Sequence, residues 1–362
     1  MVVMRTLVLW ANDLSTNLGV RALAAGTAAL VQGAVPEASF TFQSFGQPNR
    51  HLPGGRVTSI ARERVTGRLG MQQWLSQFDL VVDTRAGDSF ADIYGARRLA
   101  VMSAMAECAR QAGAVVVMGP QTIGPFTTVR GRATGRFSLH RAGAVLVRDS
   151  DSLEHAKKLG RSDATLTTDV VFALPVPAVP KTRDVVLNVS GLLWSDNPHV
   201  DAGGYRAVVA SVYERLTSSG RTVALLPHVL DSTDADNDAP AIREFAAAHA
   251  PDAEILSPTG LDDVRALVAS AEVVIGSRMH ACLNALSVGT PAIPLAYSRK
   301  FKPLLDDLGW TATVDLRSDA DPAASVEARA SDDGLASAVA TTLDRARERL
   351  LPATDAIRSA IS

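Results

Sequence analysis

Cysteine, aromatic residues and net positive charge are all scarce in this sequence, and each scarcity excludes a class of protein. The two cysteines, Cys108 and Cys282, cannot build a disulfide framework or a zinc site by themselves. Aromatic residues make up 5% of the chain, too few for a surface that stacks single-stranded nucleic acid. The formal charge of -2 lacks the basic excess typical of nucleic-acid binding. We therefore expect a cytoplasmic protein with no nucleic-acid partner.

Long apolar runs are also missing. The first residues form a short apolar stretch that ends at Asn12-Asp13, which is shorter than a secretory signal and predicts a first strand instead. No segment approaches the roughly 20 apolar residues of a membrane-spanning helix. We expect no transmembrane segment, while a peripheral contact with the inner surface of a membrane stays open.

Short apolar runs alternate with helical stretches along the whole chain, which predicts parallel sheets covered by helices. A length of 362 residues favours two domains. The segment LPVPAVP at 174–180 cannot continue a helix or a central strand, so we place a linker there. We predict one Rossmann-like domain over 1–176 and another over 181–335. A C-terminal helix is predicted over 336–362, and it could pack against the first domain.

The strand ends of the first half offer the first candidate site residues, because ligands bind beyond the carboxyl ends of parallel strands. Asn17 and Gly19 precede a helix, where exposed amides hold an anion or simply cap the helix. Gly87, Ser89 and Asp92 follow the run DLVVD. Asp92 could accept a proton from a substrate hydroxyl. Helix capping by Asp88 or Ser89 is the alternative.

Two further strand ends of the first half carry candidates. Gln121 and Gly124 lie in a rigid loop with two Gly-Pro units after the run AVVVM. Arg148 follows the run AVLV, and its planar guanidinium suits a carboxylate or a phosphate. A surface ion pair with Asp149 is the alternative.

The strongest candidates follow the predicted strand 273–275. Arg278 and His280 lie at a strand-to-helix turn, where the helix N-terminus adds partial positive charge beside a titratable ring. A capping histidine and a salt-bridged arginine are the alternative. Lys300 adds a cation after the next apolar run. The acidic run at 231–238 lacks the glycine and distal glutamate of an EF-hand, so we interpret it as a solvated loop.

These motifs, in this order and spacing from about residue 12 to 310, resemble the polysaccharide pyruvyl transferases. The block at 273–309 is the most specific part of the resemblance. The segments that carry it are NLG (17–19), GDSFAD (87–92), GPQTIGPF (119–126), VRDSDSLEHAKKLG (147–160), TTDVVFALP (167–175), LLPHV (225–229), ND (237–238) and VVIGSRMHACLNALSVGTPAIPLAYSRKFKPLLDDLG (273–309).

The resemblance implies an α/β fold of two Rossmann-like domains facing across a cleft, similar to GT-B glycosyltransferases. It implies transfer of pyruvate from phosphoenolpyruvate to a sugar of a cell-surface polysaccharide or glycolipid precursor, which forms a ketal and releases phosphate. Phosphoenolpyruvate is then a co-substrate, no other cofactor or metal is expected, and the acceptor sugar is lipid- or nucleotide-linked. Mapped onto this chain, the expected catalytic residues are His280, Asp92 and Arg148, and the expected substrate-binding residues are Arg278, Lys300, Asn17, Gly19, Gly87, Ser89, Gln121, Gly124 and His228.

The chain departs from the family pattern at one place. Members often carry a glycine triplet where this sequence has Thr84-Arg85-Ala86-Gly87, so Arg85 is expected to alter the pocket and the acceptor. A nucleotide-sugar glycosyltransferase of the same fold, or a non-catalytic member of the family, are the alternative hypotheses.

Overall fold

A computed structural model describes residues 3–233 and 236–362, so positions 234 and 235 of the acidic run lie outside the described residues. The chain forms two compact units. Unit 1 contains Leu23–Ala173, Ala346–Ser362, and Asp13 with the residues before it. Unit 2 contains Leu14–Ala22 and Leu174–Arg345. The main division therefore falls at the start of the proline-rich segment, and unit 2 also takes a short piece from near the N-terminus.

Unit 1 is built on a parallel six-stranded sheet in the order β2-β1-β3-β4-β5-β6. Leu7 of β1 pairs with Thr41 on one side and Val81 on the other, which fixes the register at the centre. The strands are β1 (Arg5–Leu9), β2 (Ser39–Gln43), β3 (Leu80–Asp83), β4 (Val115–Gln121), β5 (Ala144–Val147) and β6 (Thr165–Leu166).

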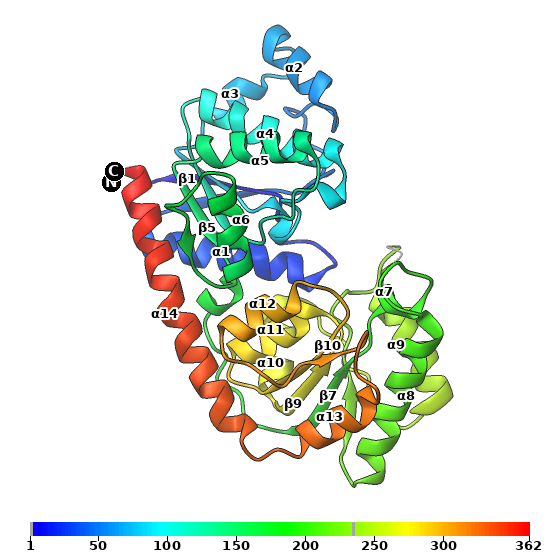
Figure 1. Ribbon diagram of the computed structural model, residues 1–362. Helices are drawn as coiled ribbons and strands as arrows, with labels where there is room; N and C mark the ends of the chain where they lie inside the picture. The colour runs from blue at the N-terminus through cyan, green and yellow to red at the C-terminus, as the bar shows by residue number, and fades with distance from the viewer. Residues whose placement is uncertain (1–2, 234–235) are drawn as a thin grey trace. The chain divides into compact units, whose positions relative to one another are not determined.

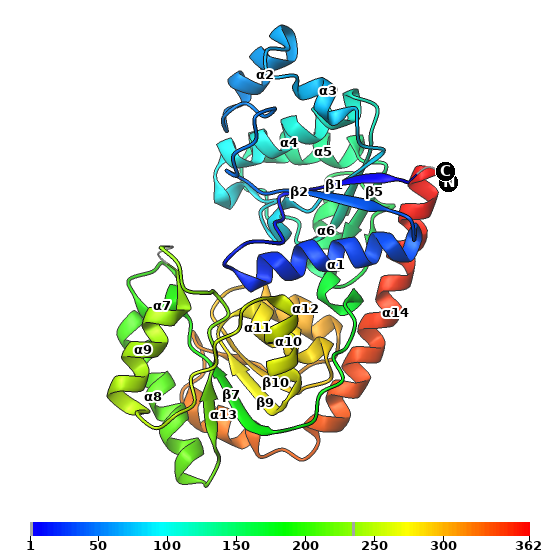
Figure 2. The same ribbon diagram turned by 180° about the vertical axis from the view of Figure 1, so that it is seen from behind.

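Helices cover both faces of this sheet, with α4 and α5 on one face and α1 on the other (Figures 1 and 2). Leu7 and Leu9 point to the α4 face, where they meet Met102 and Met105, because alternate strand residues share a face. The helices of this unit are α1 (Leu18–Ala34), α2 (Val57–Thr66), α3 (Met71–Leu75), α4 (Ala96–Gln111), α5 (Val129–Arg141) and α6 (Ser150–Lys158), with 3-10 turns η1 (Arg85–Gly87), η2 (Asp92–Tyr94) and η3 (Val170–Ala173).

Unit 2 repeats the design with a parallel five-stranded sheet in the order β11-β10-β9-β7-β8. Helices α10 and α11 pack on one face and α13 on the other (Figure 1). The strands are β7 (Arg183–Asn188), β8 (Val223–Leu225), β9 (Ala271–Gly276), β10 (Ala292–Ala296) and β11 (Val314–Asp315). The helices are α7 (Gly191–Trp194), α8 (Ala202–Ser218), α9 (Asp238–His249), α10 (Leu261–Ala269), α11 (Met279–Ser287), α12 (Phe301–Asp307), α13 (Pro322–Ala330) and most of the first half of α14 (Leu335–Ile361).

Both sheets are wound in the same way, with the first strand of each unit between its second and third. The predicted α/β fold class with two Rossmann-like domains is confirmed. In such sheets the chain order reverses on either side of the first strand, and ligands bind at the carboxyl ends of the strands that flank this switch point. The switch point lies between β1 and β3 in unit 1, and between β7 and β9 in unit 2.

The boundaries between the two units fall within two helices, α1 and α14. The first residues of α1 belong to unit 2 and the rest to unit 1, while α14 begins in unit 2 and ends in unit 1 from Ala346 onward. Among the described residues, no helix combines the length and the apolar character needed to cross a bilayer.

Candidate active site

Asp238 organises the switch point of unit 2. Its carboxylate is fully buried and lies at the first position of α9. It accepts hydrogen bonds from the backbone N–H groups of Gly191, His228 and Val229, at 2.8, 2.9 and 2.9 Å. The loops after β7 and β8 are therefore tied to one carboxylate. Asp238 was not among the predicted site residues, because an acidic run is typical of a solvated loop and the sequence does not show its partners in distant loops.

Arg278, at the end of β9, is the cationic partner of Asp238. Its Nε and Nη2 atoms donate to Oδ1 of Asp238 at 3.0 and 2.7 Å, and its Nη1 donates to Asp236 at 3.2 Å. Burial alone lowers the pKa of this guanidinium, but the attraction of Asp238 and Asp236 raises it. Its backbone N–H donates to Asn188 at 2.9 Å. Arg278 thus joins the loop after β9 to the other two, and it remains charged while 8% exposed.

The NLG turn, residues 17–19, lies against the same edge of unit 2. The N–H of Leu18 donates to the carbonyl of His228 at 3.1 Å, and Asn17 forms an isolated bridge with Val229. A Cβ atom on Gly19 would lie 3.0 Å from the ring of His280, which is closer than a side chain packs without displacing its neighbour. The structure therefore brings together four residues that the sequence singled out separately: Asn17, Gly19, His228 and His280.

The protonation of His228 follows from a chain of hydrogen bonds. Arg265 only donates, so its contact of 3.0 Å identifies Oδ1 of Asn284 as an acceptor. Nδ2 of Asn284 is then a donor, and it reaches Nε2 of His228 at 3.0 Å and the carbonyl of His280 at 2.8 Å. His228 is consequently neutral with its proton on Nδ1. Complete burial and the nearby His280 and Arg278 lower the pKa of His228 well below its usual value.

Lys300 lies near His199 and Tyr297 on unit 2. It precedes α12, and its charge contributes to lowering the pKa of His199, although burial is the larger cause. The His199 ring lies 5.2 Å from that of Tyr297, and Tyr297 is near enough to Arg278 to influence its pKa. Tyr297 therefore lies between His199 and Arg278, the residue at the switch point.

In unit 1, Arg148 is buried at the end of β5 and already paired. Its Nη1 atom lies 3.2 Å from Oδ2 of Asp169, and its Nε donates to the hydroxyl of Thr122 at 2.8 Å. Asp149, the partner considered from the sequence, lies farther away, at 3.9 Å, and instead caps α6 by accepting from the N–H of Ser152. Arg148 is 2% exposed, so its ion pair is part of the interior of the unit.

Gln121 is the most unusual of the predicted residues in unit 1. Its side chain is fully buried, and neither atom of its amide has a hydrogen-bond partner within residues 3–233 and 236–362. Buried polar atoms in proteins are normally paired with protein, water or ligand. The backbone carbonyl of Gln121 accepts from the N–H of Arg148, and the next residue, Thr122, donates its N–H to Gly87. Gln121, Gly87 and Arg148 therefore lie together.

Gly124, in the same loop, requires glycine. It has a φ of +75°, and a Cβ atom there would come within 2.7 Å of the His155 ring. Its peptide bond to Pro125 is cis. Ser89 is buried close by, with its N–H donating to the carbonyl of Arg85 at 2.9 Å.

Asp92 has a structural task that weakens the expectation of a catalytic base. Its carboxylate accepts from the N–H groups of Thr127 and Thr128 at 2.9 and 2.7 Å, and from the Thr128 hydroxyl at 2.8 Å. Partial burial acts to raise its pKa, but these hydrogen bonds outweigh it and lower the pKa to about 2. A carboxylate that is so weakly basic and so fully engaged orders the start of α5. The N-cap of α5 itself is Thr128, whose hydroxyl accepts from the N–H of Gly131.

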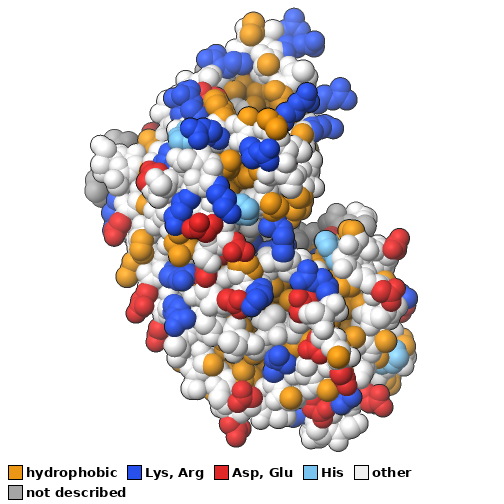
Figure 3. Space-filling view, viewed as in Figure 1, with side chains coloured by type: hydrophobic (Ala, Val, Ile, Leu, Met, Phe, Trp, Pro, Cys, Tyr) orange, Lys and Arg blue, Asp and Glu red, His pale blue; other side chains and the backbone are white. Residues whose placement is uncertain are grey.

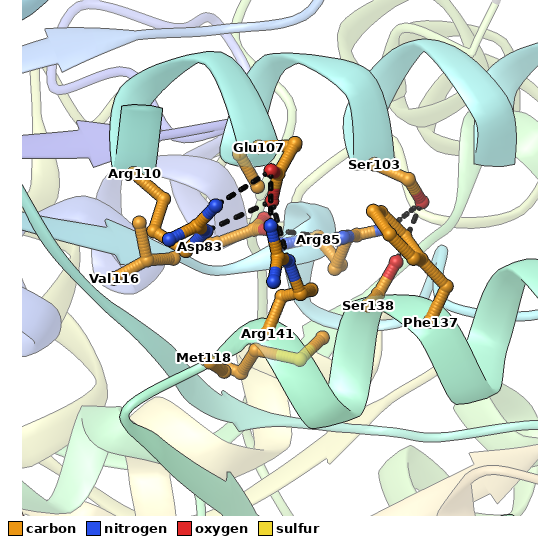
Figure 4. Close-up of a pocket in the computed structure, with 12 residues that line it drawn as sticks. Asp83, Arg85, Ser103, Glu107, Arg110, Val116, Met118, Phe137, Ser138 and Arg141 are labelled. Carbon is orange, nitrogen blue, oxygen red and sulfur yellow. Dashed lines mark hydrogen bonds and ion pairs between the residues drawn. The ribbon is translucent and has the colours of Figure 1, made fainter. Parts of the chain in front are cut away.

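The segment Thr84–Gly87 has a left-handed backbone at three successive residues, of which only Gly87 is a glycine. Arg85, Ala86 and Gly87 have φ values of +48°, +52° and +81°, a left-handed conformation that is costly for the first two. The Arg85 side chain turns into the interior, where it pairs with Asp83 at 2.7 Å and reaches Ser103 at 3.1 Å (Figure 4). Its guanidinium is fully buried over the ring of Phe90 and lines a small hollow (Figure 4).

The same small hollow holds a second charged group. Arg110 and Arg141 converge on the carboxylate of Glu107, each at 2.8 Å (Figure 4). These hydrogen bonds lower the pKa of Glu107. The hollow lies between α4 and α5, on the helix face of the sheet and not at its carboxyl edge, so we interpret these charges as structural.

The comparison with protein families shows the family of the chain. A sequence model described as polysaccharide pyruvyl transferase matches residues 17–299. The chain belongs to the polysaccharide pyruvyl transferase family. It is also 24% identical over 256 residues to the amylovoran biosynthesis protein AmsJ of Erwinia amylovora. That match spans 65% of this chain and 60% of the relative.

Solved structures with the same fold come from proteins of low sequence identity. UDP-GlcNAc 2-epimerase from Methanocaldococcus jannaschii has a TM-score of 0.54 at 11% identity, covering 91% of this chain and 94% of that one. Anabaena Alr3699/HepE in complex with UDP-glucose has a TM-score of 0.57 at 12% identity, covering 99% and 98%. These likenesses establish the fold only.

Proposed function

We propose that this transferase moves a pyruvyl group from phosphoenolpyruvate to a sugar of a cell-surface polysaccharide or glycolipid precursor. One observation carries the proposal beyond family membership. At the carboxyl edge of the unit 2 sheet, Arg278 and His280 stand beside the NLG turn, with the N-terminus of α11 adding partial positive charge. Cationic groups next to a titratable ring suit a small enol that carries a carboxylate and a phosphate.

Arg278 can serve such an anion because its two carboxylate partners differ. Asp238 is fully buried and accepts from three backbone N–H groups, so we expect it to stay paired with Arg278 when substrate binds. The Asp236 side chain is 40% exposed and contacts a single guanidinium edge with its carboxylate. We propose that the substrate anion displaces the Asp236 carboxylate from Nη1 of Arg278. Lys300, which belongs to the same unit, is proposed as a further substrate contact.

In the proposed reaction, protonated His280 gives its proton to C3 of the enol, which leaves an oxocarbenium-like C2. A sugar hydroxyl adds to C2 and loses its proton to the neutral ring of His280. A second hydroxyl of the same sugar then bonds to C2 as the C–O bond to phosphate breaks, and its proton leaves with inorganic phosphate. The ketal therefore forms with no oxidant and no cofactor in the scheme. Asp92 is not needed as a base, in keeping with its pKa of about 2.

The test is a reconstituted reaction with phosphoenolpyruvate and lipid- or nucleotide-linked sugars, in which phosphate release and the mass of the product sugar are followed. We expect His280→Gln to lose at least about a hundredfold in kcat and to remain folded. His249→Gln, at an exposed histidine of the same unit, is the matched control and should keep full turnover. Release of a nucleoside diphosphate from a nucleotide sugar, without consumption of phosphoenolpyruvate, would identify a glycosyltransferase and overturn the proposal.

A further inference from the structure

The segment 44–78 of unit 1 carries an excess of positive charge. It contains five arginines and one acidic residue, Glu63, in a protein whose formal charge is -2. Glu63 is buried, and it accepts from the backbone N–H groups of Leu69 and Met71. Its charge is thus turned inward. The five arginines are all exposed: Arg50, Arg56, Arg62, Arg64 and Arg68.

Within the described part of the chain, none of these arginines forms an ion pair with a carboxylate. Arg50 donates to the ring of His51, and Arg64 donates to the amide of Gln111. Elsewhere on the surface, arginines such as Arg243 and Arg317 do pair with aspartates. The positive charge of this segment is therefore uncompensated, and a polyanionic partner would supply what the protein does not.

Exposed apolar side chains are interspersed with these arginines. Val65 is 87% exposed, and Leu69, Val57 and Phe45 are 41%, 39% and 37% exposed. Figure 3 shows Lys and Arg side chains bordering hydrophobic ones at the end of unit 1 that carries α2. We call the five arginines together with these four apolar residues the arginine face. Arginines combined with exposed apolar side chains are typical of surfaces that lie on anionic bilayers.

A cavity of about 500 Å³ opens in the same segment. Its indole, Trp10, is 6% exposed, follows β1 with a φ of +70°, and has an Nε1 without a hydrogen-bond partner among the residues described. Indole rings favour the boundary between apolar and hydrated regions, where the N–H finds an acceptor. The apolar lining comes from Trp10, Phe45, Leu52, Ile60, Val101 and Met105.

We propose that the arginine face docks unit 1 on a membrane surface rich in anionic phospholipid, and that the cavity beside it receives an acyl chain whose ester oxygen accepts from Trp10 Nε1. The arginines attract the phosphate groups, while Val65 and its apolar neighbours enter the headgroup region. This proposal concerns binding only and does not rest on the pyruvyl transfer reaction.

The test is co-sedimentation of the full-length protein with vesicles of phosphatidylcholine, alone or mixed with phosphatidylglycerol. We expect binding to the mixed vesicles only, weakened by salt because the charges are screened. The triple variant Arg56→Gln, Arg62→Gln, Arg68→Gln should bind roughly a hundredfold more weakly, since each arginine near the surface contributes roughly fivefold. The matched triple variant Arg130→Gln, Arg243→Gln, Arg317→Gln removes the same charge from other exposed positions and should bind like the parent.

Two single variants test the apolar part, with circular dichroism to confirm that each is folded. Val65→Ser should weaken binding to mixed vesicles severalfold, and so should Trp10→Phe, which keeps an aromatic ring and removes the donor. Equal binding to both kinds of vesicle, or equal losses in the two triple variants, would overturn the docking face. Unchanged binding by Trp10→Phe would overturn the acyl-chain assignment.

Discussion

Asp238 and Arg278 form a buried ion pair, with Oδ1 of the carboxylate 2.7 Å from Nη2 and 3.0 Å from Nε of the guanidinium. The pair joins the loops that follow three adjacent strands, β7, β8 and β9. The two members of the pair differ in their surroundings. Asp238 is fully buried, whereas Nη1 of Arg278 contacts the partly exposed carboxylate of Asp236.

The first prediction concerns the stability of this edge. Asp238→Ala should lower the free energy of unfolding by about 3–5 kcal/mol, because it leaves Arg278 buried without its main countercharge. Chemical denaturation followed by circular dichroism measures the loss. Asp196→Ala, at an exposed position, should stay within about 0.5 kcal/mol of the parent. A loss of under about 1 kcal/mol for Asp238→Ala would show that the three loops hold without it.

The second prediction separates Asp236 from Asp238. Asp236→Asn should lower the KM for phosphoenolpyruvate by up to about fivefold, since an exposed ion pair contributes up to about 1 kcal/mol that the substrate must replace. Steady-state kinetics with varied phosphoenolpyruvate provides the measurement. Asp231→Asn alters a carboxylate of the same loop that pairs with Arg243, and its KM should not change. A higher KM in Asp236→Asn would instead make this carboxylate a contributor to substrate binding.

The third prediction uses two glycines of one helix. Gly19→Ala places a methyl group 3.0 Å from the His280 ring, whereas a Cβ on Gly33 meets nothing closer than 3.8 Å. Gly19→Ala should reduce kcat by about tenfold or more, because small displacements of a reacting group are costly. Gly33→Ala should leave kcat unchanged, and alanine should favour the helix in both. Equal kcat values in the two variants would remove His280 from the reaction.

The fourth prediction is a loss of stability in mild acid caused by His228. Its folded-state pKa is depressed below the value of 6.5 expected in the unfolded chain. Between these two values the unfolded state binds more protons, so the contribution of His228 to the free energy of unfolding falls as the pH decreases below 6.5 and does not change above it. The slope approaches about 1.4 kcal/mol per pH unit. His228→Gln, which keeps an acceptor for Asn284, should lack this slope when urea unfolding is compared across the window. A slope that persists in the variant would assign the effect to other groups.

The sequence predicts the fold class well because both sheets consist of short apolar runs that are buried on two faces. The run at 144–147 coincides with β5, and 273–275 lies inside β9. The two-residue strands β6 and β11 were not predicted, because pairing at a sheet edge, and not an apolar pattern, defines them. The run at 253–256 forms only an isolated bridge between Ile255 and Leu225.

The positions of Asn17, Gly19 and His280 at strand ends indicated them as candidates, and the resemblance added His228. Unit 2 brings these four residues together, while their roles remain predictions. The ion pairs were not predictable, because the partner of Arg278 is 40 residues away in the sequence and that of Arg148 is 21 residues away. Asp238 looked solvated for the same reason. The roles of Arg148, Lys300 and Gln121 in binding remain predictions.

The piece of chain at Leu14–Ala22 has a practical consequence for anyone who wishes to dissect the enzyme. A recombinant fragment that starts at Leu174 would contain every strand of the second sheet but would lack Thr16 and Leu18, whose backbone groups bond to Leu230 and His228. Its His280 would also have lost the glycine against which it packs. A synthetic peptide that spans those nine residues should therefore restore the missing wall when added in trans, which makes this half of the protein suited to peptide complementation.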